Sequence, residues 1–162
     1  MKRIAQELSQ EVQYTGEAYE QMIARLRKEA ASPLSCLIVV VAPSSAQIQM
    51  VANDLAEKLG KTLHHAKPGS VASKYIGETE KNLAALLDQA SSSGWVLFFD
   101  EADALFGKRT KVKDSHDRYA NQENSYLLQM LEKHCGIIIL GSRSSRELLM
   151  RLPKIRTLVV KV

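Results

Sequence analysis

Short apolar runs alternate along this chain with segments that have the spacing of amphipathic helices. The apolar runs, which we predict to be strands, lie at residues 36–41, 61–66, 95–100, 136–142 and 157–162. Helical spacing covers residues 46–59, 78–90 and 117–134. Continuous apolar strands separated by helices are typical of a parallel sheet that is covered on both faces. The pattern therefore predicts an α/β fold.

Residue spacing also predicts where one of these helices ends and which side of another is apolar. Gly60 follows the helix over 46–59 and is expected to end it. Helical spacing over 117–134 places five apolar or aromatic side chains on one face, namely Tyr119, Tyr126, Leu127, Met130 and Leu131. We expect Trp95 and the tyrosines of this helix to lie in the core.

A further helical pattern precedes the first strand. Over residues 3–31, apolar side chains recur at three- and four-residue steps, namely Ile4, Leu8, Val12, Tyr19, Met22, Ile23 and Leu26. Gly16 is expected to interrupt this pattern, and Pro33 ends it because the residue before a proline is pushed away from helical geometry. We therefore predict an N-terminal helical segment and linker at 1–35 and an α/β domain at 36–162.

Composition excludes several classes of protein. The chain has 162 residues, of which 45% are hydrophobic and 25% charged, as in an ordinary globular domain. No apolar run reaches the roughly 20 residues of a membrane span. The N-terminus lacks the apolar core of a secretory signal, so we expect a cytoplasmic protein. The net charge of +4 is spread along the chain, which does not favour nucleic-acid binding.

Cysteine and histidine residues do not predict a metal site or a disulfide framework. Two cysteines, Cys36 and Cys135, each lie at the start of an apolar run and are expected to be buried thiols. The four histidines have no zinc-type spacing.

The strongest local signal for function is the segment VLFFDEADALFGKR, residues 96–109. A buried strand that ends in Asp100 and Glu101 sets two carboxylates at the carboxyl edge of a parallel sheet, where ligands bind in such folds. One carboxylate can hold Mg²⁺ and its neighbour can orient an attacking water. Alternatively, the pair caps the turn that follows the strand.

The order of several segments resembles the AAA+ ATPase core of the classical AAA type. These segments are SKYIGETEKNL at 73–83, the acidic strand, and GIIILGS at 136–142. Residues 100–132 look especially like the AAA ATPases of phage-tail-like contractile injection systems. The resemblance covers roughly residues 36–162 and implies a three-layer P-loop NTPase-type parallel sheet in the order 5-1-4-3-2. It also implies that Asp100 would bind Mg²⁺ and that Glu101 would be the catalytic carboxylate.

The phosphate loop of that family usually reads Gly-Pro-Pro-Gly-Thr-Gly-Lys-Thr. This chain has at the same place Ala42, Pro43, Ser44, Ser45, Ala46, Gln47, Ile48 and Gln49. Ile48 replaces the lysine that grips phosphate, and Gln49 replaces the hydroxyl that ligates magnesium. The glycines are also gone, and other residues resist positive φ by roughly 1–2 kcal/mol each. The resemblance thus identifies a degenerate phosphate loop.

Helical spacing predicts that Ile48 faces the core rather than a ligand. It shares an apolar stripe with Val51, Ala52, Leu55 and Leu59. We expect no nearby cation to substitute for the missing lysine, because Lys58 and Lys61 lie near the far end of the helix.

Other positions also depart from the family pattern. Ser142 and Arg143 stand where the family has Thr-Asn, whose Asn positions the attacking water. Lys154 and Ile155 stand where it has paired arginines, which leaves Arg156 as a shifted candidate for the arginine finger. The helical lid of the family is expected to be absent, since the last core strand ends the chain at Val162.

One segment keeps the family pattern. Lys74, Tyr75, Ile76 and Gly77 match the aromatic-aliphatic-glycine loop that faces the pore of AAA+ rings and grips a substrate chain. Alternatively, this is a solvated turn whose tyrosine packs on its own domain. The basic run at 107–118 matches the second pore-facing loop, or is a plain charged loop.

Two functions follow as hypotheses. The first is a module without ATP hydrolysis and with no cofactor, which binds protein partners such as AAA+ subunits or contractile-injection components in a hetero-oligomer or ring. The second is an active AAA+ ATPase that binds ATP and Mg²⁺, remodels a protein substrate and completes its site with partner residues. A nucleic-acid-binding domain that uses residues 107–118 and 143–161 is disfavoured.

The implied strand order has a geometric consequence. The first and fourth strands are neighbours in the order 5-1-4-3-2, so Cys36 and Cys135 should lie near one another at the same edge of the sheet.

Overall fold

The computed structural model describes residues 11–29, 35–107, 125–144, 146–152 and 157–162. Its strands are β1 (Glu11–Gln13), β2 (Ser35–Val41), β3 (Leu63–Ala66), β4 (Val96–Phe99), β5 (Gly136–Ser142) and β6 (Thr157–Lys161). Its helices are α2 (Glu17–Glu29), α3 (Ser45–Lys58), α4 (Pro68–Val71), α5 (Glu78–Ser93), the π-helical turn η1 (Asp103–Gly107) and α7 (Arg146–Arg151). A further helix covers residues 125–133.

The strands form one parallel sheet in the order β1-β6-β2-β5-β4-β3. Leaving out β1, this is the predicted order 5-1-4-3-2. All five predicted strands are present, and the prediction of an α/β fold is confirmed. The central strand β2 pairs with β5 from Ser35↔Gly136 to Val41↔Ser142. The carboxyl ends of these two strands therefore lie side by side.

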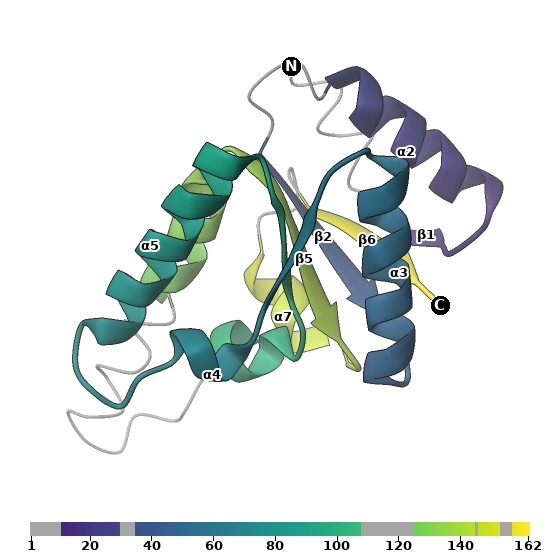
Figure 1. The fold of residues 1–162 in the computed structure, drawn as a ribbon. Coiled ribbons are helices and arrows are strands. Elements are labelled where there is room, and N and C mark those ends of the chain that lie inside the picture. Colours follow the sequence, from purple (N-terminus) through teal and green to yellow (C-terminus); the bar gives the residue numbers. More distant parts are fainter. Residues whose placement is uncertain (1–10, 30–34, 108–124, 145, 153–156) are drawn as a thin grey trace.

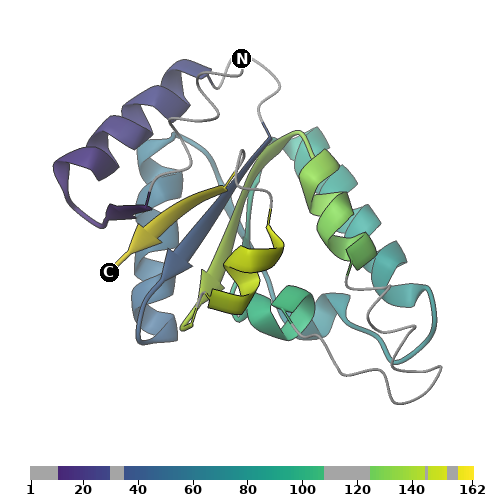
Figure 2. The ribbon, with the colours of Figure 1, turned by 180° about the vertical axis from the view of Figure 1, so that it is seen from behind.

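Helices cover both faces of this sheet and make a three-layer structure (Figures 1 and 2). Successive residues of a strand point to opposite faces, so each central strand contributes to two separate cores. Ile38 and Val40 pack with α2 and α3, whereas Leu37 and Val39 pack with α5, α7 and the helix at 125–133. Burial on both faces explains why these strands read as continuous apolar runs.

The N-terminal segment departs from the predicted helix. Residues 11–13 form the strand β1, parallel to β6, so Val12 lies in a strand and not in a helix. The helix α2 begins only at Glu17, directly after Gly16, where we predicted an interruption. Ion pairing between Lys161 Nζ and Glu11 Oε1, 3.0 Å apart, supports the edge pairing. Ile4 and Leu8 lie outside the described residues.

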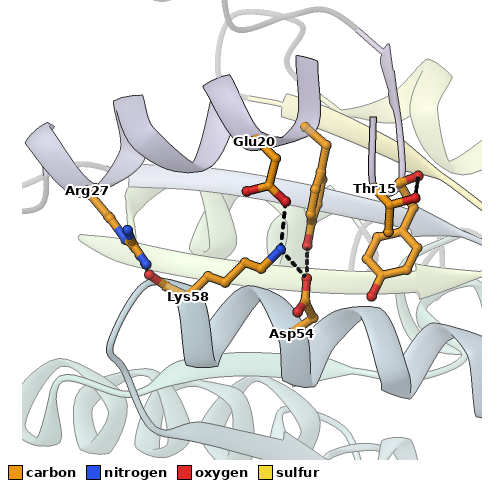
Figure 3. Close-up of polar contacts among 7 residues, drawn as sticks. Thr15, Glu20, Arg27, Asp54 and Lys58 are labelled. Carbon is orange, nitrogen blue, oxygen red and sulfur yellow. Dashed lines mark hydrogen bonds and ion pairs between the residues drawn. The ribbon is translucent and has the colours of Figure 1, made fainter. Parts of the chain in front are cut away.

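The helix α2 is held on α3 by an apolar face and a polar network. Its buried residues are Tyr19, Met22, Ile23 and Leu26. The Tyr19 hydroxyl donates to Asp54 Oδ2 at 2.8 Å, and Lys58 Nζ lies 2.7 Å from Glu20 Oε1 and 3.3 Å from Asp54 Oδ2 (Figure 3). Arg27 Nε also donates to the carbonyl oxygen of Lys58. The segment before the first predicted strand is thus packed on the core.

Two predictions about burial are wrong. Cys36 is 3% exposed, and burial raises the pKa of its thiol to about 12, but Cys135 is exposed. Both lie at the amino-terminal edge of neighbouring strands as predicted, since Cys36 pairs with Ile137. Tyr126 is 53% exposed, although Leu127 and Leu131 of the predicted face are buried and Met130 packs against the same core. Tyr119 lies outside the described residues.

Other local predictions agree with the structure. The helix α3 ends at Lys58, and Gly60 adopts a φ of +67° after it. Trp95, which we predicted to lie in the core, packs against it but is only partly buried, and it stacks on His64 at a ring-centroid distance of 4.4 Å. In the described part of the chain, every helix is too short or too polar to cross a membrane.

The Tyr19–Asp54 hydrogen bond gives a first prediction. Tyr19→Phe removes the hydroxyl and keeps the buried ring, so the free energy of unfolding should fall by about 1 kcal/mol. Tyr19→Ala also leaves a cavity and should lower it by about 3–5 kcal/mol. Urea unfolding followed by the fluorescence of Trp95, the single tryptophan, measures both values. Tyr75→Phe, at a 64% exposed tyrosine, is the control. Equal effects of the two Phe variants would contradict this role of the hydroxyl.

His134 makes stability depend on pH. It is 6% exposed, and burial lowers the pKa of its imidazole below the usual 6.5, against the opposing effect of Asp88. Below pH 6.5 the unfolded chain therefore binds the proton more readily than the folded one. The contribution of neutral, buried His134 to the free energy of unfolding is therefore complete above pH 6.5. It is lost as the pH falls from 6.5 toward the lowered pKa of the folded state.

The variant His134→Phe keeps a ring and cannot titrate. Its unfolding free energy should vary less with pH between about 6.5 and 5.5 than that of the wild type, as measured by urea unfolding at each pH. His65→Phe, at a partly buried histidine, is the control. An unchanged pH dependence in His134→Phe would refute this role of His134.

Candidate functional site

Three segments that carry predicted nucleotide-site residues come together at the carboxyl edge of the sheet. The strands β2, β5 and β4 are adjacent and parallel, with Val41 beside Ser142 and Phe99 beside Leu140. The turn at 42–44, the residues after β5 and the acidic residues after β4 therefore meet at one edge. Open parallel sheets bind ligands at this edge.

The turn between β2 and α3 leads directly into the helix. Ser44 is the N-cap of α3, with φ −135° and ψ 152°, and its Oγ accepts from the Gln47 N–H at 3.3 Å. All residues at 42–49 have negative φ. The Ala42 N–H donates to the Ser142 carbonyl oxygen at 3.3 Å, which ties the turn to β5.

Ile48 lies in the core, as predicted. It is 1% exposed and belongs to the apolar cluster that joins α3 to the sheet. A Cβ atom on Gly141 of β5 would lie only 2.5 Å from Ile48 Cγ2 and 3.3 Å from the Phe98 ring. The Ile48 side chain thus fills the space that the missing side chain of Gly141 leaves open.

The two carboxylates after β4 differ in their surroundings. Asp100 Oδ1 accepts the backbone N–H of Glu101 at 2.9 Å, so Asp100 does cap the turn. Glu101 is exposed and has a φ of +52°, a left-handed conformation that is uncommon for any residue except glycine. Such strain of roughly 1–3 kcal/mol is often found at functional sites.

Asp103 is a site residue that sequence reasoning missed. Its Oδ2 lies 2.5 Å from the hydroxyl of Ser142, which is 1% exposed. The same hydroxyl lies 2.8 Å from the Ser144 carbonyl oxygen and accepts the Ser144 N–H at 3.2 Å. Asp103 is three residues after Asp100, a helical spacing that was the available signal for its place at this edge.

Arg143 corrects the prediction that no cation lies near the turn. Its Nη2 donates to the Ser45 hydroxyl at 3.3 Å, across the sheet edge and 98 residues away in sequence. Ser45 is the first residue of α3, and the first turn of α3 has no acidic residue. The sequence did not indicate this contact, because the two residues are far apart along the chain and are brought together by the pairing of β2 with β5.

The loop before α5 presents two apolar side chains to solvent. Tyr75 is 64% and Ile76 80% exposed, so the alternative in which this tyrosine packs on its own domain is wrong. Gly77 has a φ of +80° at the N-cap of α5. The Ser73 hydroxyl donates to Glu78 at 2.9 Å, which holds the base of the loop. Lys74 Nζ lies 5.6 Å from the centroid of the Tyr75 ring.

Several predicted features lie outside the described residues. These are Lys154, Ile155, the finger candidate Arg156 and the basic run from residue 108 to 118. Within the described part of the chain, no three His, Cys, Asp or Glu side chains gather closely enough to hold a metal ion. Asp100 with Asp103 or Glu101 is the oxygen-rich set that would suit Mg²⁺ beside a nucleotide.

Comparison with known proteins identifies the family. Residues 49–154 match the model of the ATPase family associated with various cellular activities (AAA). This chain belongs to the AAA family. The matched region begins directly after Ile48, the buried residue of the β2–α3 turn.

Relatives of known sequence agree with this membership. The chain is 31% identical over 105 residues to an "AAA ATPase forming ring-shaped complexes" of Corynebacterium jeikeium, a match that covers 61% of this chain and 20% of that protein. It is 29% identical over 94 residues to a katanin p60 ATPase-containing protein of Danio rerio, covering 57% of this chain and 19% of that protein. It thus spans about a fifth of these relatives.

A solved structure confirms the fold. The FIGL-1 AAA domain in complex with ADP superposes with a TM-score of 0.57 over 90% of this chain and 53% of that domain's chain. The sequence identity is 18%, so the likeness applies to the fold alone. The prediction of a P-loop NTPase-type sheet is confirmed.

The contact between Ile48 and Gly141 gives a prediction on packing. Gly141→Ala places a methyl group against Ile48 and Phe98 and should lower the free energy of unfolding by about 1–3 kcal/mol. The double variant Ile48→Ala/Gly141→Ala should lose less than the sum of the single losses, because the first change makes room for the second. Gly69→Ala, where a Cβ meets nothing within 4 Å, is the control. Additive losses in urea unfolding would refute the contact.

Proposed function

We propose that this chain is an AAA-family domain that no longer hydrolyses ATP and acts by binding other proteins. The burial of Ile48 carries this proposal. By the resemblance to the family motif, Ile48 stands where the phosphate-gripping lysine would be, and its side chain is 1% exposed in the core. Replacing a charge-assisted hydrogen bond by an apolar side chain removes roughly 1.5–3 kcal/mol of phosphate binding.

The backbone of the turn supports the same proposal. A phosphate-binding loop wraps its ligand with successive N–H groups and relies on glycine to do so. Here the turn contains no glycine, all its φ angles are negative, and the Ala42 N–H already donates to Ser142. The family match also starts at residue 49, after this turn.

Protein partners are the proposed ligands. The exposed pair Tyr75 and Ile76, with Lys74 beside the aromatic ring, offers an apolar and cationic contact for an extended polypeptide. One relative is described as forming ring-shaped complexes. We therefore propose that the chain docks beside AAA subunits in a hetero-oligomer or ring, and that the loop at 74–77 faces the substrate path. We also propose that the phosphate loop at 42–49 (the Walker A motif) is degenerate. The proposal further includes a cytoplasmic location and a relation to the ATPases of contractile injection systems.

A second candidate function is an active ATPase whose site a partner completes. Glu101 is exposed at the sheet edge in a strained conformation, as an attacking-water carboxylate would be placed. Arg143, whose guanidinium contacts Ser45 at the start of α3, would be the cation for phosphate in place of the missing lysine. Asp100 would hold Mg²⁺.

Calorimetry with Mg-ATP at millimolar concentration separates the two functions. We expect no heat of binding from the wild-type chain and no ATP hydrolysis. Ile48→Lys should not create hydrolysis either, because the added ammonium group enters an apolar core and the turn still lacks glycine. The control for protein quality is the cooperative unfolding of each sample.

A magnesium-dependent binding signal would overturn the first proposal and favour the second. In that case Arg143→Ala should weaken nucleotide binding, and Glu101→Gln should abolish hydrolysis while binding remains. Turnover by Ile48→Lys alone would contradict the view that the turn has been rebuilt.

A further inference from the structure

Three consecutive residues at the end of β5 join the parts of the candidate site to one another. Gly141 receives Ile48 of α3, the Ser142 hydroxyl meets Asp103 of η1, and Arg143 reaches Ser45 at the start of α3. A fourth link comes from the main chain, where the Ser142 carbonyl oxygen accepts the N–H of Ala42. The end of one strand is thus bonded to the β2–α3 turn, to α3 and to the acidic turn after β4.

Ser142 makes the strongest of these links. It is 1% exposed, and its hydroxyl lies 2.5 Å from Asp103 Oδ2, a length typical of a bond from a hydroxyl to a carboxylate. The hydroxyl accepts the backbone N–H of Ser144 and has one proton to donate, for which Asp103 Oδ2 is nearer than the Ser144 carbonyl oxygen at 2.8 Å. Such hydrogen bonds are roughly twice as strong as neutral ones.

Arg143 makes the longest-range link. Its guanidinium is exposed and donates to the Ser45 hydroxyl at 3.3 Å. The link spans the gap between β5 and the first turn of α3, at the place where a ligand phosphate would lie in a nucleotide-binding member of this fold.

We propose that residues 141–143, at the end of β5, form an internal lock. Their contacts join the β2–α3 turn, α3 and the acidic turn after β4, which nucleotide and metal would otherwise bridge. This proposal rests on the function proposed above, because a lock of this kind gives a non-hydrolysing domain one fixed conformation. Partners would then meet the same surface whether or not ATP is present.

Hydrogen–deuterium exchange tests the lock without any nucleotide. Ser142→Ala removes the link to Asp103 and should raise the exchange of backbone amides at 100–106 by about tenfold, because local opening becomes easier. Arg143→Ala should raise the exchange at 42–48, also by a few-fold. The amides of β3, on the far side of β4, should keep their wild-type rates in both variants.

Two further variants complete the test, Ser144→Ala as the matched control and Asp103→Asn as a second lock variant. Ser144→Ala keeps the backbone N–H and carbonyl that contact Ser142, so its exchange should equal that of the wild type. Asp103→Asn weakens the same bond from the other side without emptying the buried position of Ser142. It should raise exchange at 100–106, and Ser142→Ala/Asp103→Asn should add little to either single change.

The outcomes distinguish this inference from the proposed function. If Ser142→Ala, Asp103→Asn and Arg143→Ala all leave exchange at 42–48 and 100–106 unchanged, there is no lock, whatever the chain does with ATP. If the variants behave as expected but Mg-ATP slows exchange at 42–48 in the wild type, the lock exists and the non-binding function is wrong. Both the lock and the proposed function are supported if the three lock variants raise these exchange rates while Mg-ATP and Ser144→Ala leave them unchanged.

Discussion

Close packing of Ile48 against Gly141 sets how near α3 can lie to β5, and the candidate site depends on that distance. Only a residue without a side chain lets Ile48 Cγ2 approach β5, since a Cβ there would stand 2.5 Å away. With α3 held so near, the Arg143 guanidinium reaches the Ser45 hydroxyl at the start of that helix. An apolar contact in the core therefore decides which polar groups meet at the sheet edge.

Local sequence patterns predicted the central elements because those elements are buried. Each of the strands β2, β4, β5 and β6 is apolar on both faces, and such runs are visible without knowledge of the partner strand. The strand order was available only through the resemblance to the AAA family, since periodicity carries no information on which strands pair. Ile48 was predicted correctly to face the core because its stripe on α3 has helical spacing.

Two failures of prediction come from contacts between residues distant in sequence, and a third comes from the width of a helix face. Val12 falls in a sequence pattern with helical spacing, yet it lies in a strand and pairs with Val160 at the far end of the chain. Tyr126 shares a face with Leu127 and Leu131, but spacing alone does not say how wide the covered part of that face is. Arg143 follows a strand and has no local reason to lie near Ser45. Distant contacts therefore decided the places of Val12 and Arg143, and partial coverage of the helix decided that of Tyr126.

The acidic side of the site has a different character from the turn side. Asp100 and Asp103 have structural roles, as acceptors of the Glu101 N–H and the Ser142 hydroxyl. Among the described residues, Glu101 forms hydrogen bonds only through its main-chain N–H and carbonyl, and its φ of +52° is a strain that glycine or asparagine would relieve. Replacing Glu101 by glycine would therefore remove this strain from the folded state.

The strain at Glu101 and the burial of Ile48 therefore point in opposite directions. A glutamate held in a left-handed conformation suits a site that works on a ligand, whereas a buried apolar residue, at the position that the resemblance gives to the phosphate-gripping lysine, suits a site that does not. The proposed non-hydrolysing function accommodates both features, because the β2–α3 turn is hydrogen-bonded to β5 through Ala42 and Ser142 while the acidic turn keeps Glu101 exposed. The turn, α3 and the acidic residues are then held together by the protein's own contacts, while Glu101 and the Tyr75–Ile76 pair stay exposed to solvent.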